Sequence, residues 1–74
     1  MTLADLIHGA SSQITGFISS GENLSRLLSM GVIPGASARV LRTAPLGDPM
    51  QVNIEGTLLS IRKADAQQIQ VELV

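Results

Sequence analysis

Apolar and polar side chains alternate along several short segments, and this alternation constrains the fold more than any other feature of the sequence. The clearest case is a stretch in which Met50, Val52 and Ile54 alternate with polar residues. Successive side chains of a strand point to opposite faces, so a period of two predicts a half-buried strand. By this pattern the chain contains five short strands, at Gln13 to Ser19, Ala38 to Thr43, Met50 to Ile54, around Leu59 and Ile61, and at 69–73.

In two of these strands, the alternation predicts which side chains share a face. In the first strand, Ile14 and Ile18 are expected on the same face. In the last strand, Ile69, Val71 and Leu73 are expected together, facing the core.

A short helix is predicted between the first two strands. Leu24, Leu27 and Leu28 fall at i, i+3 and i+4, which places them on one stripe of a helix of about two turns. Residues 19–23 offer several N-cap candidates, and Gly31 is placed for a left-handed C-cap. We expect the leucines to close one end of the strand assembly. A single further helical turn is expected at 64–67.

The chain of 74 residues has no linker, low-complexity segment or internal repeat, which predicts one domain, 1–74, around one small core. Five short strands with one apolar face hide their edges best by bending into a small barrel. The predicted fold class is therefore mainly β, a five-stranded barrel with one short helix inserted after the first strand.

The connection between the second and third strands is stiffer than a hairpin needs. It reads Ala-Pro-Leu-Gly-Asp-Pro, in which Pro45 fixes φ and lacks a backbone donor, while Gly47 permits positive φ. Leu46 and Asp48 stand at its tip. A rigid projection that carries one apolar and one acidic side chain suggests a surface for a partner protein. The alternative is that Leu46 folds back onto the core.

Composition excludes several classes of function. A net charge of −1 and a single aromatic residue, Phe17, give neither the basic surface nor the stacking platform that nucleic-acid binding needs. The chain has no cysteine, and no glycine-rich loop carries the lysine and hydroxyl of a phosphate-binding loop. We expect no enzymatic activity, because the single histidine, His8, has no evident orienting group.

Metal binding is weakly indicated at most. Asp5 and His8 are three residues apart and would share a face of a helical turn at 2–7, but two ligands do not make a metal site. We expect no metal and no cofactor. The acidic start and the lack of a long apolar run predict neither an export signal nor a membrane span, which points to the cytoplasm.

Four segments together resemble the FeoA family, the small cytoplasmic partners of the FeoB ferrous-iron transporter. They are the helix end Leu-Leu-Ser-Met-Gly-Val-Ile-Pro-Gly at 27–35, the turn at 44–49, Leu-Ala-Asp-Leu at 3–6 and Leu-Leu-Ser-Ile-Arg-Lys at 58–63. The resemblance covers nearly the whole chain, and its most specific part is the order of the first two segments.

The resemblance implies an SH3-like barrel and a non-enzymatic accessory or regulatory protein of ferrous-iron uptake. Such a protein would bind the cytoplasmic GTPase region of FeoB and would meet the membrane only through that partner. The expected partner-binding residues are Leu46 and Asp48, with Pro45 and Gly47 framing them and Arg26 on the helix as a second patch. Nothing in the pattern specifies an oligomeric state.

Two alternatives stay open at this point. FeoA-like barrels also occur as accessory domains of metal-dependent transcriptional repressors, so the chain could be a stand-alone regulatory module of that type. We expect the transport role instead, since 74 residues leave no room for a DNA-binding portion. The other alternative is a weak ferrous-iron carrier that uses Asp5, His8 and Asp48.

Overall fold

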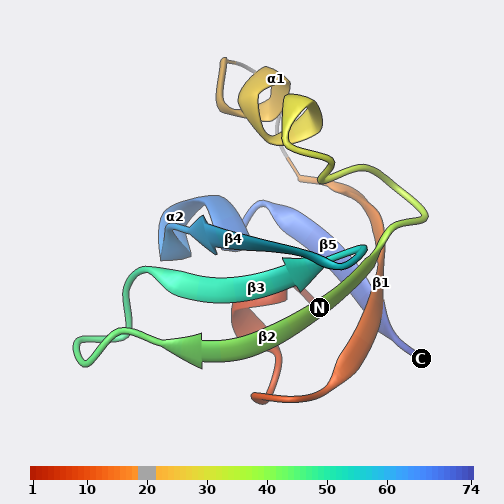
Figure 1. Ribbon diagram of the computed structural model, residues 1–74. Coiled ribbons are helices and arrows are strands. Elements are labelled where there is room, and N and C mark those ends of the chain that lie inside the picture. Colours follow the sequence, from red (N-terminus) through yellow and green to blue (C-terminus); the bar gives the residue numbers. More distant parts are fainter. Residues whose placement is uncertain (19–21) are drawn as a thin grey trace.

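The computed structural model describes residues 1–18 and 22–74 and contains five strands and three short helical segments (Figure 1). In chain order the elements are η1 (Leu3–Asp5), β1 (Ser11–Phe17), α1 (Glu22–Ser29), β2 (Ser37–Thr43), β3 (Met50–Ile54), β4 (Thr57–Ile61), α2 (Lys63–Ala66) and β5 (Ile69–Leu73). All five predicted strands are present, and so are the predicted helix and the later helical turn.

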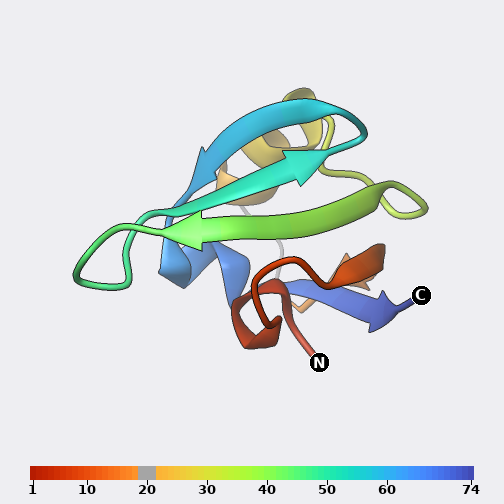
Figure 2. The same ribbon diagram turned by 60° about the horizontal axis from the view of Figure 1, so that its bottom comes forward.

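The strands form one antiparallel sheet with the order β4-β3-β2-β1-β5. The sheet curves strongly, as two views of the ribbon show (Figure 1, Figure 2). The predicted closed barrel is wrong in one respect: in the described part of the chain, β4 and β5 do not pair with each other. Because α2 connects these two strands, and because the N-terminal segment pairs with the outer edge of β5 through Thr2 and Gln70, the sheet stays open.

Two bulges account for much of the curvature. In β2 the register against β3 shifts between Val40 and Arg42, so Leu41 is an extra residue. A bulge bends its strand and increases the local twist. Val40 is therefore fully buried, whereas Leu41 and Arg42 are both exposed. In β1 the register against β5 shifts in the same way around Thr15.

The core lies on the concave side of the sheet and follows the predicted alternation. Its buried apolar side chains are Leu3, Leu6, Ile14, Leu27, Val32, Ala36, Ala38, Val40, Met50, Val52, Ile54, Ile61, Ala66, Ile69 and Val71. Ile61 is buried and Leu59 packs against this core, as predicted. Burial of this apolar surface is the main stabilising term for a chain with no disulfide.

Three predictions about the strands need correction. The first strand begins at Ser11, not Gln13, because the buried Ser12 takes a core position and donates its hydroxyl to the Ala38 carbonyl at 2.7 Å. Ile18 lies outside β1 and is exposed, since the bulge separates it from the face of Ile14. Leu73 is 60% exposed because it ends the last strand, beyond the edge of the core.

Helix α1 ends as the sequence predicts. Gly31 has φ of +93°, its N–H donates to the Leu28 carbonyl at 3.1 Å, and the Val32 N–H donates to the Leu27 carbonyl at 3.1 Å. This pair of bonds is the Schellman arrangement, which a residue with positive φ makes possible. Leu27 joins the core, but Leu28 remains exposed, so only part of the leucine stripe closes the end of the sheet. The N-cap candidates at 19–21 lie outside the described residues.

Candidate docking surface

The connection between β2 and β3, which we call the hairpin tip (residues 44–49), projects from the body of the molecule (Figure 1, Figure 2). Gly47 donates its N–H to the Ala44 carbonyl at 2.7 Å, and Ala44 donates its own N–H to the Pro49 carbonyl at 2.9 Å. Pro45 fixes the φ of the first central position, and Gly47 adopts φ of +86°. The tip is therefore a closed turn whose two prolines donate no backbone hydrogen bond, although the Pro49 carbonyl accepts one.

Leu46 stands at the end of this tip with 96% of its surface exposed. The alternative that it folds back onto the core is therefore not what the structure shows. Pro45 is exposed beside it, and Gly47 is half-buried. An isolated exposed leucine is common on protein surfaces, but this one is held away from the body by a turn with its own hydrogen bonds.

Asp48 is exposed, and its carboxylate also contacts α2. Its Oδ1 accepts a hydrogen bond of 2.9 Å from the backbone N–H of Lys63, in the first turn of α2. That N–H has no acceptor within the helix, and the positive end of a helix favours a carboxylate. Asp48 therefore fixes the hairpin tip against α2, a role that the sequence did not predict.

Arg26 also contacts α2. Its Nη2 lies 2.8 Å from Asp65 Oδ2, where the Arg26 side chain is 57% exposed and the Asp65 side chain 9% exposed. The ion pair joins α1 to α2 across 39 positions of sequence. Arg26 and Asp48 thus bind different residues of the same four-residue helix.

A shallow pocket of 270 Å³ lies at the base of the hairpin tip, lined by Arg42, Thr43, Ala44, Pro45, Pro49 and Gln51. Arg42 Nε donates to Gln51 Oε1 at 2.8 Å, which fixes the guanidinium at the rim. The projecting leucine and this pocket together give the tip both a protrusion and a recess.

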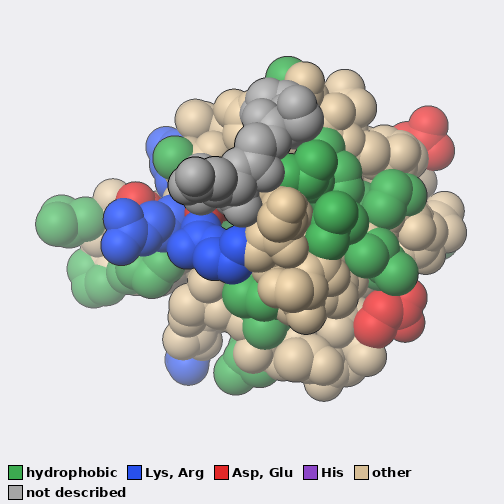
Figure 3. Space-filling model, turned by 90° about the horizontal axis from the view of Figure 1, so that it is seen from above, with side chains coloured by type: hydrophobic (Ala, Val, Ile, Leu, Met, Phe, Trp, Pro, Cys, Tyr) green, Lys and Arg blue, Asp and Glu red, His purple; other side chains and the backbone are tan. Residues whose placement is uncertain are grey.

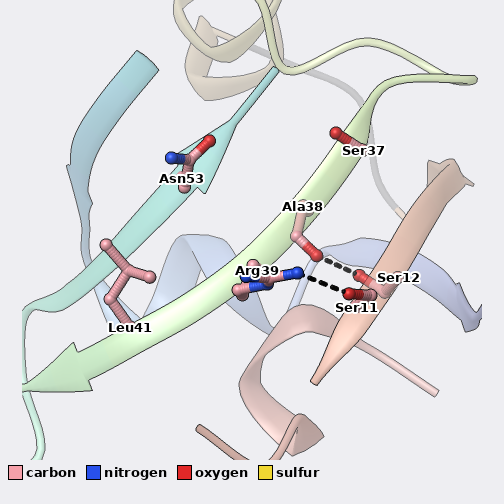
Figure 4. A pocket seen from close by; sticks show the side chains of 7 residues that line it. All are labelled: Ser11, Ser12, Ser37, Ala38, Arg39, Leu41 and Asn53. Carbon is pink, nitrogen blue, oxygen red and sulfur yellow. Dashed lines mark hydrogen bonds between the residues drawn. The ribbon is translucent and has the colours of Figure 1, made fainter. Parts of the chain in front are cut away.

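A second pocket, of 210 Å³, lies on the outer face of β1, β2 and β3 (Figure 4). It is polar, and its hydrogen-bonding groups largely bind one another: Arg39 Nη2 donates to Ser11 Oγ at 2.9 Å, and Ser12 donates to the Ala38 carbonyl. None of its lining residues is a histidine or an acid, so the serine hydroxyls have no general base there.

In the part of the chain that the structure describes, no hydrogen bond or ion pair joins Asp5 to His8, the two residues considered as metal ligands near the N-terminus. Asp5 Oδ2 accepts hydrogen bonds from the backbone N–H of Thr2 at 2.8 Å and from its hydroxyl at 3.2 Å, and these bonds lower the pKa of Asp5 from its usual value. His8 is exposed. Among the described residues, no group of three or more histidine, cysteine or acidic side chains could hold a metal ion.

No helix in the part of the chain that the structure describes is long and apolar enough to cross a membrane.

Comparison with known proteins gives a consistent result. A family model described as the FeoA domain matches residues 1–73. A Porphyromonas gingivalis protein, named as a fusion of Fe(2+) transport protein A and the Fe(2+) transporter FeoB, is 35% identical over 74 residues. That match covers all of this chain but only 9% of the fusion protein.

Two solved structures share the fold. Iron(II) transport protein A from Clostridium thermocellum has a TM-score of 0.95 and 36% identity, covering 100% of this chain and 46% of that one. FeoA from Stenotrophomonas maltophilia, described as a prokaryotic SH3 domain protein and solved with zinc, has a TM-score of 0.82 and 25% identity, covering 97% of this chain and 89% of that one. These likenesses confirm the predicted SH3-like fold.

Proposed function

This chain belongs to the FeoA family, which is linked to ferrous-iron transport, and we propose that it is a non-enzymatic accessory or regulatory protein of ferrous-iron uptake. In this proposal it acts in the cytoplasm by binding the GTPase region of a FeoB-like transporter. The relative from P. gingivalis, whose name joins the two proteins in one chain, supports an association between them. The membrane is then reached only through the partner.

The observation that carries this proposal is the exposed Leu46 on an anchored turn. The turn is closed by its own hydrogen bonds and tied to α2 through Asp48, so binding would not require the tip to be ordered first. Pro45 and Gly47 set the shape of the contact. The main contribution of Asp48 is to hold the tip in place.

Arg26 provides the second contact in this proposal. Its guanidinium already pairs with the nearly buried Asp65, so a partner would meet an oriented and partly neutralised charge. A rim charge of this kind contributes mainly to the rate and orientation of association. Replacing Arg26 should therefore weaken binding less than replacing Leu46.

In this proposal no residue is assigned a catalytic role. In the described residues, the Ser12 hydroxyl donates to the Ala38 carbonyl and the Ser11 hydroxyl accepts from Arg39, and no hydrogen bond joins either serine to His8. A nucleophile needs a base within hydrogen-bonding reach.

The test is a calorimetric titration of the chain against the cytoplasmic GTPase domain of a FeoB-like transporter, with GTP analogue, with GDP and without nucleotide. Burying a leucine contributes about 1.5–3 kcal/mol, so Leu46→Asp should weaken binding by at least tenfold. The same variant should leave thermal unfolding unchanged, because Leu46 contributes nothing to the core.

The matched control is Ile7→Asp, which places the same charge at another strongly exposed aliphatic residue, away from the tip. It should leave the affinity unchanged. Equal affinity of wild type and Leu46→Asp would remove the hairpin tip from the proposal, and no binding in any nucleotide state would remove the GTPase domain as the partner.

A further inference from the structure

The two outer strands of the sheet differ in how their free edges are covered. The outer edge of β5 is covered by the N-terminal segment, where the Val71 N–H donates to the Met1 carbonyl at 3.0 Å and Thr2 forms a bridge with Gln70. The outer edge of β4 has no such partner, since β4 pairs only with β3 in the described part of the chain. An uncovered edge offers a row of backbone donors and acceptors to another strand.

The geometry of the β3–β4 hairpin shows which backbone N–H and C=O groups of β4 point away from β3. Glu55 and Gly56 have φ of 50° and 89°, as in a tight two-residue turn that joins a hydrogen-bonded pair, here Ile54 and Thr57. In an antiparallel ladder such pairs alternate with pairs whose backbone groups point away from the partner strand. The N–H and C=O groups of Leu58 and Ser60 therefore face the open edge. No other group in the described residues hydrogen-bonds to them.

The side chains around this edge would suit an added strand. Leu58 is 58% exposed on the outer face of the sheet, and the half-buried Leu59 lies on the inner face. Leu28 of α1 is exposed as well, and a pocket of 120 Å³ lies between α1, β4 and α2. β4 itself contains neither a charged residue nor a proline, which are the devices that usually keep an edge from pairing.

Charge is distributed unevenly along this edge. Arg62 and Lys63 follow β4 directly and are exposed, whereas Glu55 precedes it. On the face seen from above, basic side chains lie toward the hairpin tip, and hydrophobic side chains lie both at the tip and on the opposite side (Figure 3). A strand running antiparallel to β4 would begin beside Arg62 and Lys63 and end near Glu55.

We propose that the open edge of β4 binds an extended segment of a partner protein by strand addition, antiparallel to β4, with acidic residues at the start of the segment and apolar residues at alternate positions. Backbone bonds to Leu58 and Ser60 supply the pairing, and Arg62 and Lys63 select the direction. The basic end of this surface adjoins the hairpin tip, where Asp48 accepts the Lys63 N–H, whereas Leu58 and Ser60 belong to β4. The proposal does not depend on the identity of the transporter partner.

The probe is a synthetic peptide with two glutamates followed by alternating valine and threonine, added to the ¹⁵N-labelled full chain. Amide hydrogen exchange followed by NMR should show slower exchange at Leu58 and Ser60 on addition of the peptide. The amides of Thr57 and Leu59, which face β3, should change little. A peptide of the same composition with the glutamates at its end should bind about threefold more weakly at low salt.

Variants locate the contact. Ser60→Pro removes one outward N–H and should weaken peptide binding about fivefold. Leu58→Lys leaves the backbone intact and should weaken it about threefold through the lost apolar pair. Its matched control is Leu73→Lys, since Leu73 is equally exposed but lies on the covered strand, and this variant should bind the peptide as wild type does.

Several outcomes would overturn the proposal. Unchanged exchange at Leu58 and Ser60 with the peptide in large excess would show that the edge does not accept a strand. Tighter binding of the reversed peptide would contradict the antiparallel direction. If sedimentation shows a dimer that Leu58→Lys disrupts, the edge binds a second copy of this chain and the assignment to a partner segment is wrong.

Discussion

Replacing Asp48 with alanine should loosen the hairpin tip and lower the stability of the whole domain. Asp48 Oδ1 accepts the Lys63 N–H at 2.9 Å, and this donor lies in the first turn of α2, where no helical carbonyl can accept it. Losing a capping acceptor of this kind costs about 1 kcal/mol. In a domain of this size each 1 kcal/mol lowers the unfolding midpoint by roughly 4–8 °C.

The assay is thermal unfolding followed by circular dichroism, together with NMR exchange of the Lys63 amide. Asp48→Ala should lower the midpoint and speed the exchange of that amide. Asp48→Asn is the control, because its side-chain oxygen can still accept the bond, and it should lose only part of the stability. If Asp48→Ala changes neither the midpoint nor the Lys63 exchange, the hairpin tip is not anchored to α2 and the reasoning about its rigidity fails.

Three further predictions concern the folded domain. In a double-mutant cycle measured by urea unfolding, Arg26→Gln and Asp65→Asn should show a coupling free energy of roughly 1 kcal/mol, since the carboxylate is nearly buried and the guanidinium half exposed. Additive effects of the two substitutions would show that the ion pair contributes nothing to stability. Gly31→Ala should lower the free energy of unfolding by about 1 kcal/mol, because Gly31 has φ of +93°, which residues with a Cβ disfavour. A Cβ there would meet nothing within 4 Å, so the cost comes from the backbone alone, and an unchanged urea midpoint would contradict this. Hydrogen bonds from Thr2 hold the pKa of Asp5 below its usual value, so Asp5 stabilises the fold above its unfolded-state pKa and loses that contribution as pH falls through the lower folded pKa. Asp5→Asn should therefore make the free energy of unfolding less dependent on pH below about pH 4. If the free energy of unfolding falls equally with decreasing pH in the variant and in the wild type, Asp5 does not have this role.

Local patterns in the sequence predicted most of the secondary structure. The alternation at 50–54 gives β3 with the correct bounds, and Gly31 ends α1 by the expected cap. The start of β1 was missed because Ser12 is polar, and it fills a core position only by donating its hydroxyl to Ala38. The open sheet could not be predicted either, since it depends on a pairing between the N-terminal segment and β5 at the far end of the chain.

The sequence predicted the stiff turn at the hairpin tip but not the contacts that hold it. The two prolines and Gly47 indicated a stiff turn, and Leu46 is exposed at its end. The partners of Asp48 and Arg26 lie 15 and 39 residues away, so no local spacing could have identified them. Asp65 lies in a predicted helical turn, but its ion pair with Arg26 depends on how α1 packs against the sheet, which no local pattern predicts.

The most direct test of the central claim is an NMR map of the ¹⁵N-labelled chain bound to the cytoplasmic GTPase domain of a FeoB-like transporter. The account predicts that the largest shift changes fall on the hairpin tip, residues 44–49, with smaller changes around Arg26. Binding accompanied by changes confined to other surfaces, with the tip resonances unmoved, would contradict it.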